Sequence, residues 1–311
     1  MKIEERIKRL TQLVNIKIPI FQGAMAHIAD HKLACAVSEA GGLGTIASGG
    51  MCAGELYREI ELFRENCDKP FAVNVALKDE NVEELFRVLR EMHVPVVVTG
   101  AGNPERYMEA LKSDGITVIP VVASVALARR MQKCGADAVI VEGMESGGHI
   151  GNTTTMSLVP QIDDVIGIPI IAAGGIADER GIAAALMLGA SAVQMGTRFI
   201  AAKECDAAPE YKEKILKAKD ISTVVLNMTQ IEKDNIRAIR NALTKKYLSM
   251  EYAGENVDAM LKDSLRVAAK EGNVESGLFM AGQISGLLED EICIADYIGD
   301  IWKKTEILLK Q

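Results

Sequence analysis

The residues best suited to chemistry are concentrated in the stretch 139–151, which reads VIVEGMESGGHIG. Its first three residues are apolar and β-branched, as in a strand buried on both faces of a parallel sheet. Glu142 places a carboxyl group where this strand ends, and His149 follows Gly147 and Gly148 in a loop. Glycines allow a ligand to approach the backbone, and an imidazole can transfer a proton near neutral pH. We therefore treat His149 as a candidate proton donor, with an ordinary structural loop histidine as the alternative.

Strand and helix patterns alternate along the first 200 residues. Short apolar runs that we expect to be strands occur at 18–21, 43–47, 71–75, 94–98, 118–122, 139–141, 169–173 and 192–195. Alternation with short connections predicts an α/β fold with a parallel sheet, and eight units predict a closed (β/α)8 TIM barrel. An open doubly wound sheet is the alternative. The first strand–helix loop, however, lacks the Gly-x-Gly-x-x-Gly fingerprint of a dinucleotide-binding fold.

The repeating pattern stops near residue 200. We expect residues 1–204 to form the barrel, and 205–290 to form a smaller region of helices and loops that covers or flanks the barrel mouth. A C-terminal helix within 291–311 should pack on the barrel through one apolar face. Segment 277–286 is apolar and glycine-spaced, so it could either pack tightly on the barrel or cover its mouth.

Polar residues and glycines recur where the predicted strands end. In a TIM barrel these carboxyl ends form one mouth, where active sites are built. The residues at or just beyond the ends are Gln22, Asn74, Thr99, Glu142, Gly174 and Gly196. The pairs Gly174–Gly175 and Gly196–Thr197 follow strands seven and eight, where barrel enzymes often hold a phosphate on backbone N–H groups. Each pair alone could be a tight turn, but together they favour a phosphate-bearing ligand.

Composition narrows the classes of function. The chain has 311 residues, of which 49% are hydrophobic, and a net charge of −8, which argues against a general nucleic-acid binder. No apolar run approaches the ~18 residues that a membrane span needs. The N-terminus carries no apolar signal core, and the six cysteines show no metal-ligand spacing and no Cys-x-x-Cys pair. We therefore expect a cytoplasmic protein with reduced thiols.

Five segments resemble the nitronate monooxygenase superfamily. They are PIFQG at 19–23, TGAGNP at 99–104, EGMESGGHIG at 142–151, AAGGIAD at 172–178 and GTRF at 196–199. The similarity runs over nearly the whole chain and is greatest to the branch of flavin-dependent enoyl-acyl-carrier-protein reductases. Ala24 departs from the family pattern, because a second glycine is usual at this position beside the flavin.

The resemblance implies that FMN binds in the barrel mouth and that NADH or NADPH is the co-substrate. The residues expected to hold the cofactor are Gln22, Gly23, Ala24, Met25, Asn74, Thr99, Glu142, Gly147, Gly148, Ala173, Gly174, Gly175, Gly196 and Thr197. It also implies a homodimer, a monovalent-cation site of unknown ligands, and His149 as the group that donates a proton to the substrate or organises its carbonyl.

The implied substrate is a trans-2-enoyl thioester on an acyl carrier protein. Because such carriers are acidic, contact would need local basic residues, and Arg198 and Lys203 are candidates, although either could instead form an ion pair that stabilises the fold. Two other functions stay open: a nitronate monooxygenase that uses FMN and O2, and a flavin-free barrel isomerase or synthase acting on a phosphorylated metabolite.

Overall fold

Eight parallel strands form one sheet in the computed structural model, which describes residues 1–230, 234–257 and 259–311. The strands are β1 (Ile20–Gln22), β2 (Gly44–Ala47), β3 (Phe71–Ala76), β4 (Val96–Gly100), β5 (Thr117–Val122), β6 (Val139–Glu142), β8 (Ile170–Ala173) and β9 (Ala192–Met195). Their order is β1-β9-β8-β6-β5-β4-β3-β2. A bridge between Phe21 and Leu43 joins the first strand to the segment before the second. The predicted TIM barrel is confirmed, and the open sheet was the wrong alternative.

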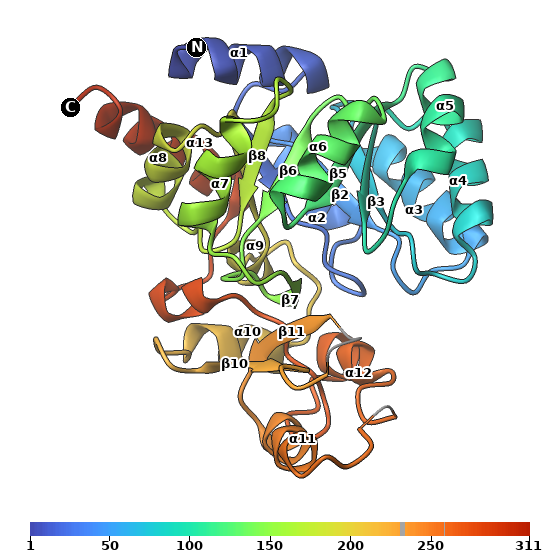
Figure 1. The fold of residues 1–311 in the computed structure, drawn as a ribbon, viewed down its shortest axis with the longest axis vertical. Helices are drawn as coiled ribbons and strands as arrows, with labels where there is room; N and C mark the ends of the chain where they lie inside the picture. Colours follow the sequence, from blue (N-terminus) through green and yellow to red (C-terminus); the bar gives the residue numbers. More distant parts are fainter. Residues whose placement is uncertain (231–233, 258) are drawn as a thin grey trace.

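Helices cover the outside of the barrel (Figure 1). They are α2 (His31–Glu39), α3 (Ala53–Asn66), α4 (Val82–Glu91), α5 (Glu105–Ser113), α6 (Val125–Lys133), α7 (Thr155–Asp163) and α8 (Glu179–Met187). Helix α1 (Ile3–Val14) lies across one end of the barrel, and the short helix α9 (Thr197–Ile200) follows β9 at the other end. Asp30, Ser124 and Asp178 accept hydrogen bonds from the first-turn N–H groups of α2, α6 and α8, as expected of N-caps. None of the described helices is both long and apolar enough to cross a lipid bilayer.

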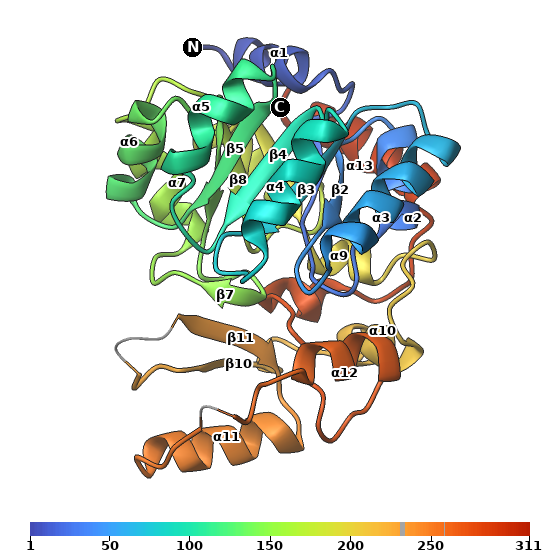
Figure 2. The ribbon, with the colours of Figure 1, turned by 90° about the vertical axis from the view of Figure 1, so that its right-hand side faces the viewer.

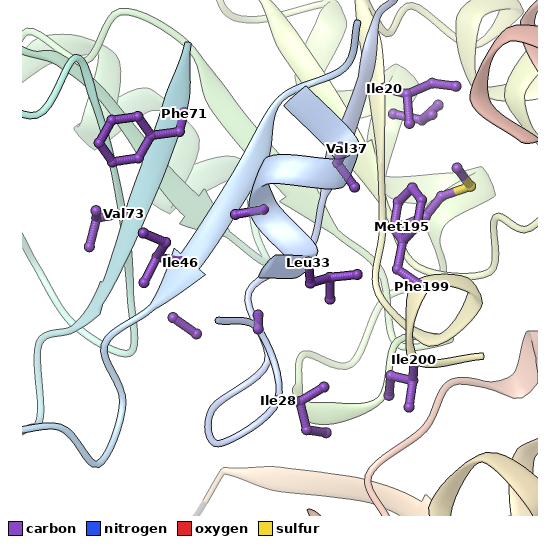
Figure 3. Packing of buried hydrophobic residues seen from close by; sticks show 14 of the residues in the cluster. Ile20, Ile28, Leu33, Val37, Ile46, Phe71, Val73, Met195, Phe199 and Ile200 are labelled. Carbon is purple, nitrogen blue, oxygen red and sulfur yellow. The ribbon is translucent and has the colours of Figure 1, made fainter. Parts of the chain in front are cut away.

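The apolar core lies on both sides of the barrel wall. Between strands and helices, Leu33 and Val37 of α2 pack with residues of β2, β9 and α9 in one large cluster (Figure 3). Inside the barrel a second cluster includes Leu10 and Val14 of α1 together with Phe21 and other strand residues. Because α1 closes the amino end of the strands, the open end of the barrel is the carboxyl end, where the site lies.

A second body of structure lies beneath the carboxyl ends of the strands (Figure 2). We call the described residues of 205–290 the cap. It contains α10 (Pro209–Leu216), β10 (Thr223–Leu226), β11 (Asn235–Ile239), α11 (Ala242–Tyr252), α12 (Ser264–Glu271) and the 3-10 helix η1 (Gln283–Leu287). The two strands were not predicted, because runs this short carry little periodic signal. They form an antiparallel sheet with β7 (Gly148–Ile150) in the order β10-β11-β7.

The chain returns to the barrel after the cap. The last helix, α13 (Ile294–Leu308), contacts α8 and α2 on the outside of the barrel. It buries Ile294, Ile298 and Ile301 on one face, as its sequence pattern predicts. The domain boundaries at 204 and 290 stay a prediction, since β7 lies before residue 204 in the sequence but pairs with the cap.

Candidate functional site

A cavity of about 550 Å³ is lined both by residues at the carboxyl ends of the strands and by residues of the cap. Loops after most of the barrel strands contribute to its lining, as expected of a barrel mouth. Of the residues that the sequence assigned to the site, those that line it are Gly23, Ala24, Met25, Asn74, Glu142, Gly147, Gly148, His149, Ala173, Gly174, Gly175, Gly196 and Thr197. The fold therefore brings together residues that are up to 174 positions apart in the chain, from Gly23 to Thr197.

Gln22 and Thr99 do not line this cavity. The Gln22 amide is fully buried: its Nε2 donates to Thr45 O at 2.8 Å and to Gly23 O at 3.2 Å, and its Oε1 accepts from Thr45 N at 3.1 Å. Thr99 is also buried, within β4. A position at the end of a strand does not fix the direction of the side chain, and here the side chain of Gln22 bonds β1 to β2 instead of pointing into the mouth.

The loops after β8 and β9 present backbone donors to the cavity. Gly174 and Gly175 have φ angles of +99° and +74°, which side chains rarely tolerate. A Cβ atom on Gly174 would also lie 2.7 Å from Ser146 Oγ. Among the hydrogen bonds of the described residues, none is donated by the N–H groups of Gly174, Gly175 or Gly196. Unpaired N–H groups beside an open cavity fit an anionic group such as a phosphate.

Side-chain hydrogen bonds join the loop after β8 to the start of α7 and to the loop after β6. The Glu145 carboxylate accepts a hydrogen bond from Thr155 N at 2.9 Å, and its Oε2 lies 3.0 Å from Thr155 Oγ1. The same hydroxyl lies 2.9 Å from Gly174 O. Helix α7, which begins at Thr155, thus connects the loop after β6 to the loop after β8. This connection fixes both glycine loops relative to each other.

The segment 280–283 of the cap closes one wall of the cavity. Gly282 N donates to Thr197 Oγ1 at 2.9 Å and Gln283 N donates to Glu145 O at 2.9 Å. Tyr211 OH donates to Met280 O at 2.7 Å. Met280 and Gly282 also line the cavity. The sequence left two alternatives for the longer segment 277–286, packing on the barrel or covering the mouth. The structure shows that residues 280–283 within it do both.

His149 reaches the cavity from the cap side. It lies on β7, opposite Ile236 of β11, and it lines the cavity at the barrel mouth. The neighbouring pair, Gly148 and Arg237, is held by the buried Arg237 guanidinium, which donates to Met144 O from Nε at 3.1 Å and from Nη2 at 3.0 Å. Burial lowers the pKa of His149, and of the two charges acting on it Asp234 raises the pKa whereas Lys78 lowers it.

Glu142 lies deeper, at the end of β6. Burial raises the pKa of its carboxyl group to about 8, from an ordinary value of 4.5. At neutral pH the cavity therefore contains a largely protonated carboxylic acid and, because the pKa of His149 is lowered, a largely neutral imidazole. The first is a proton and hydrogen-bond donor, and the second can act as a base.

A family model described as nitronate monooxygenase matches residues 7–93 and 81–304, which together span most of the chain. The chain belongs to the nitronate monooxygenase family. This result agrees with the resemblance seen in the sequence segments at the strand ends. Members of the family are flavin enzymes that use FMN. The cavity fits this cofactor, because it combines unpaired backbone N–H groups for a phosphate with a lining of glycine and small residues for a ring system.

Individual relatives of the family carry different names. The structure of FabK from Thermotoga maritima is 48% identical, covers 97% of each chain and superposes with a TM-score of 0.94. A probable nitronate monooxygenase of Staphylococcus saprophyticus is 34% identical over 90% of this chain and 93% of its own. A (3aS,4S,5R,7aS)-5-hydroxy-7a-methyl-1-oxo-octahydro-1H-indene-4-carboxyl-CoA dehydrogenase of Rhodococcus jostii is 32% identical over 94% of each chain. The family therefore establishes an oxidoreductase, whereas the substrate is a separate question.

Sequence reasoning missed several residues that line the cavity. Those with chemically informative side chains include His27, Lys78, Asp79, Glu145, Tyr211, Asp234 and Met280. Lys78 and Asp79 follow β3 by two and three residues, so extending the search past each strand end would have found them. Asp234 comes from the cap and reaches the mouth only through tertiary packing, for which the sequence carried no signal. Met280 belongs to the glycine-spaced segment 277–286, which the sequence did offer as a cover of the mouth.

Proposed function

We propose that the protein is an FMN-dependent enoyl-acyl-carrier-protein reductase, which reduces trans-2-enoyl thioesters with NADH or NADPH in bacterial fatty-acid elongation. The observation that carries the proposal is the 48% identity to FabK of Thermotoga maritima over 97% of both chains, against 34% or less to the curated relatives described above. Within the resemblance to the family, the segments Gly148–Gly151 and Ala202–Glu204 are most similar to the reductase branch, and they support the same assignment.

When bound, FMN would supply the hydride chemistry, and the protein supplies orientation and electrostatics. The N–H groups of Gly174, Gly175 and Gly196 are suited to hold its phosphate. Ala24, Met25 and Asn74 line the part of the cavity suited to its ring system. The backbone of 280–283 closes one wall and limits the access of water.

Reduction of an enoyl thioester also needs a proton at the α-carbon and a partner for the thioester carbonyl oxygen. His149 faces the mouth from the cap, so it can give the proton to the α-carbon or donate a hydrogen bond to that carbonyl. Because its lowered pKa leaves the ring largely neutral at neutral pH, His149 must take up a proton before it can give one to the α-carbon. Protonated Glu142 is the second group in the cavity with a proton to give. Mutation of each residue in turn separates proton donation by His149 from proton donation by Glu142.

The remaining parts of the proposal concern partners. An acidic carrier protein would need exposed basic residues at the mouth. Arg198 is unsuitable, because it is buried beneath Asp290 and Tyr297, whereas Lys203 is exposed. A homodimer, a cytoplasmic location and a monovalent cation complete the proposal. For the cation, the described residues contain no cluster of three or more His, Cys, Asp or Glu side chains placed so that they could hold a metal ion.

A nitronate monooxygenase is the second candidate, and one observation favours it. The lowered pKa of His149 gives a neutral imidazole at pH 7, which is the form needed to remove a proton from a nitroalkane. The family description and the name of the Staphylococcus saprophyticus relative agree with this activity.

A paired assay with the purified protein separates the two. We expect crotonyl thioester to be reduced with NADH or NADPH faster than an alkyl nitronate is oxidised with O2. Faster nitronate turnover, with no reduction of the thioester, would overturn the proposal in favour of the second candidate. A protein that purifies without a yellow flavin spectrum would instead favour the flavin-free isomerase or synthase.

A further inference from the structure

One ion pair joins the barrel to the cap across the cavity mouth. Lys78 lies in the loop after β3, and Asp234 immediately precedes β11. Lys78 Nζ lies 2.5 Å from Asp234 Oδ2, and both residues line the cavity. Their side chains are 66% and 51% exposed, so water surrounds the pair. An ion pair this exposed contributes little to global stability. Its position beside the site therefore says more about its role than its strength does.

The same ion pair lies next to His149. In the antiparallel pairing of β11 with β7, Ile236 stands opposite His149 and Asn235 stands opposite Ile150. Asp234 is therefore two residues from the position that faces His149, immediately before the first residue of β11. Asn235 adds a side-chain contact here, because its Nδ2 donates to Asn152 Oδ1 at 2.8 Å. The strand that carries His149 is thus positioned by the cap strand that begins at Asn235, directly after Asp234.

The charges around His149 can be assigned element by element. Among the described residues, Asp234 before β11 and Lys78 after β3 are the two charged groups that act on the imidazole. The buried Arg237 on β11 is directed to Met144 O and acted on by Glu145. Three other acidic groups line the cavity: Asp79 in the loop after β3, Glu142 at the end of β6 and Glu145 in the loop after β6.

We propose that Asp234 and Lys78 are positioning residues for His149: their ion pair fixes the start of β11, and through it β7, against the barrel loop after β3. Each partner also acts on the imidazole through its own charge. The carboxylate of Asp234 favours the protonated ring and the ammonium of Lys78 disfavours it, so the pair balances the protonation of His149. The catalytic consequence rests on the function proposed above, but the effect on His149 itself does not.

Direct titration of His149 tests the inference. The chain has four histidines, so labelling them with 13C at Cε1 gives a simple NMR spectrum, and the spectrum of His149→Gln assigns the relevant signal. In the flavin-bound protein, Asp234→Asn should lower the titration midpoint of His149, because it removes the carboxylate and leaves Lys78 unpaired. Lys78→Met should raise the midpoint, and the double variant should lie between the two single variants.

The chain offers a closely matched control. Lys32 Nζ lies 2.6 Å from Asp206 Oδ2, with side chains 57% and 49% exposed, and this pair also joins a barrel helix to the cap. Asp206→Asn should leave the titration of His149 unchanged. If Asp234→Asn and Lys78→Met also leave the midpoint unchanged, or if Asp206→Asn moves it equally, the inference is overturned.

Kinetics connect the titration to catalysis. The pH dependence of enoyl thioester reduction should shift in the same direction as the NMR midpoint in each variant, whereas the rate of flavin reduction by nicotinamide should not change. A moved midpoint with an unmoved pH profile would overturn the catalytic consequence. If the unmodified protein reduces no enoyl thioester at all, the proposed function fails, while the NMR titration still decides whether the ion pair controls His149.

Discussion

Gly147 touches the backbone of Ala281, so that a Cβ atom on Gly147 would lie 2.6 Å from Ala281 Cα. The contact joins the loop before β7 to the segment of the cap that bonds Thr197 and Glu145. A distance this short leaves no room for any side chain, and the neighbour is backbone that cannot rotate away. The closure of the cavity wall therefore depends on glycine at position 147.

Substitution of Gly147 by alanine should force the segment 280–283 away from the barrel. We expect the free energy of unfolding to fall by about 1–3 kcal/mol, as for other overpacked sites. Amide hydrogen exchange at Gly282 and Gln283 should accelerate, because their acceptors are Thr197 and Glu145 on the barrel side. Gly299→Ala is the control, since a Cβ atom at Gly299 meets nothing within 4 Å. Unchanged exchange in Gly147→Ala would show that the wall does not depend on this contact.

The phosphate assignment predicts that Gly175→Val purifies as a folded protein with little bound flavin. A side chain at this position blocks the approach of a ligand to the backbone, and the φ of +74° adds strain. Gly115→Val separates the two effects, because Gly115 has a φ of +75° but open space around it, after α5 and before β5. Flavin content per protein is read from absorbance. Full occupancy in Gly175→Val would remove the assignment.

The role proposed for His149 predicts that the two half-reactions of the enzyme respond differently when this residue is replaced. Reduction of bound flavin by nicotinamide needs no proton from the protein, so His149→Ala should be bleached at a nearly normal rate. Reoxidation by enoyl thioester should slow by ~10²-fold or more, the typical contribution of a positioned acid. Stopped-flow absorbance measures both steps. If flavin binding and both steps decline together, His149 only shapes its loop, and an intact oxidative step would assign the proton to another group such as Glu142.

Glu142 should leave a signature in the dependence of stability on pH. Its folded-state pKa of about 8 lies above the ordinary 4.5, so between these values the folded protein holds a proton that the unfolded chain has released. The free energy of unfolding therefore falls as pH rises through this window, by up to ~1.4 kcal/mol per pH unit from this group. Glu142→Gln lacks this dependence, so its stability relative to the unmodified protein should increase from about pH 5 to about pH 8 and then level off. Urea unfolding across this range checks the prediction, and a constant difference would contradict it.

The barrel and most of its mouth could be predicted because both depend on local patterns. Apolar runs such as 139–141 mark strands, and the glycines at 174, 175 and 196 mark loops at their carboxyl ends. The direction in which a side chain points, in contrast, is not determined by such local sequence patterns. Gln22 was predicted at the mouth because it follows a strand, but its side-chain amide donates hydrogen bonds to the backbone oxygens of Thr45 and Gly23.

The contribution of the cap could not be predicted for a different reason. Asp234 reaches the mouth because β11 pairs with β7, and this pairing joins residues more than 80 positions apart. Register between distant strands depends on the packing of both bodies, and β7, with three residues, is too short for a pattern that would indicate it. Even His149, which the sequence did single out, was expected in a loop, whereas it belongs to a strand completed by the cap.

The pairing of β7 with β11 also bears on how this protein could be divided or recombined. β7 lies between β6 and β8 in the sequence, yet its hydrogen-bonding partner is in the cap. A shortened chain that ends after β9 would keep β7 but lose its partner strand, leaving an exposed edge that invites pairing between molecules. Exchange of the cap between homologous proteins would meet the same difficulty, because the incoming strand must match Gly148–Ile150 in register. The cap is therefore not an independent module, and changes in it must be accompanied by changes in the barrel loop that contains β7.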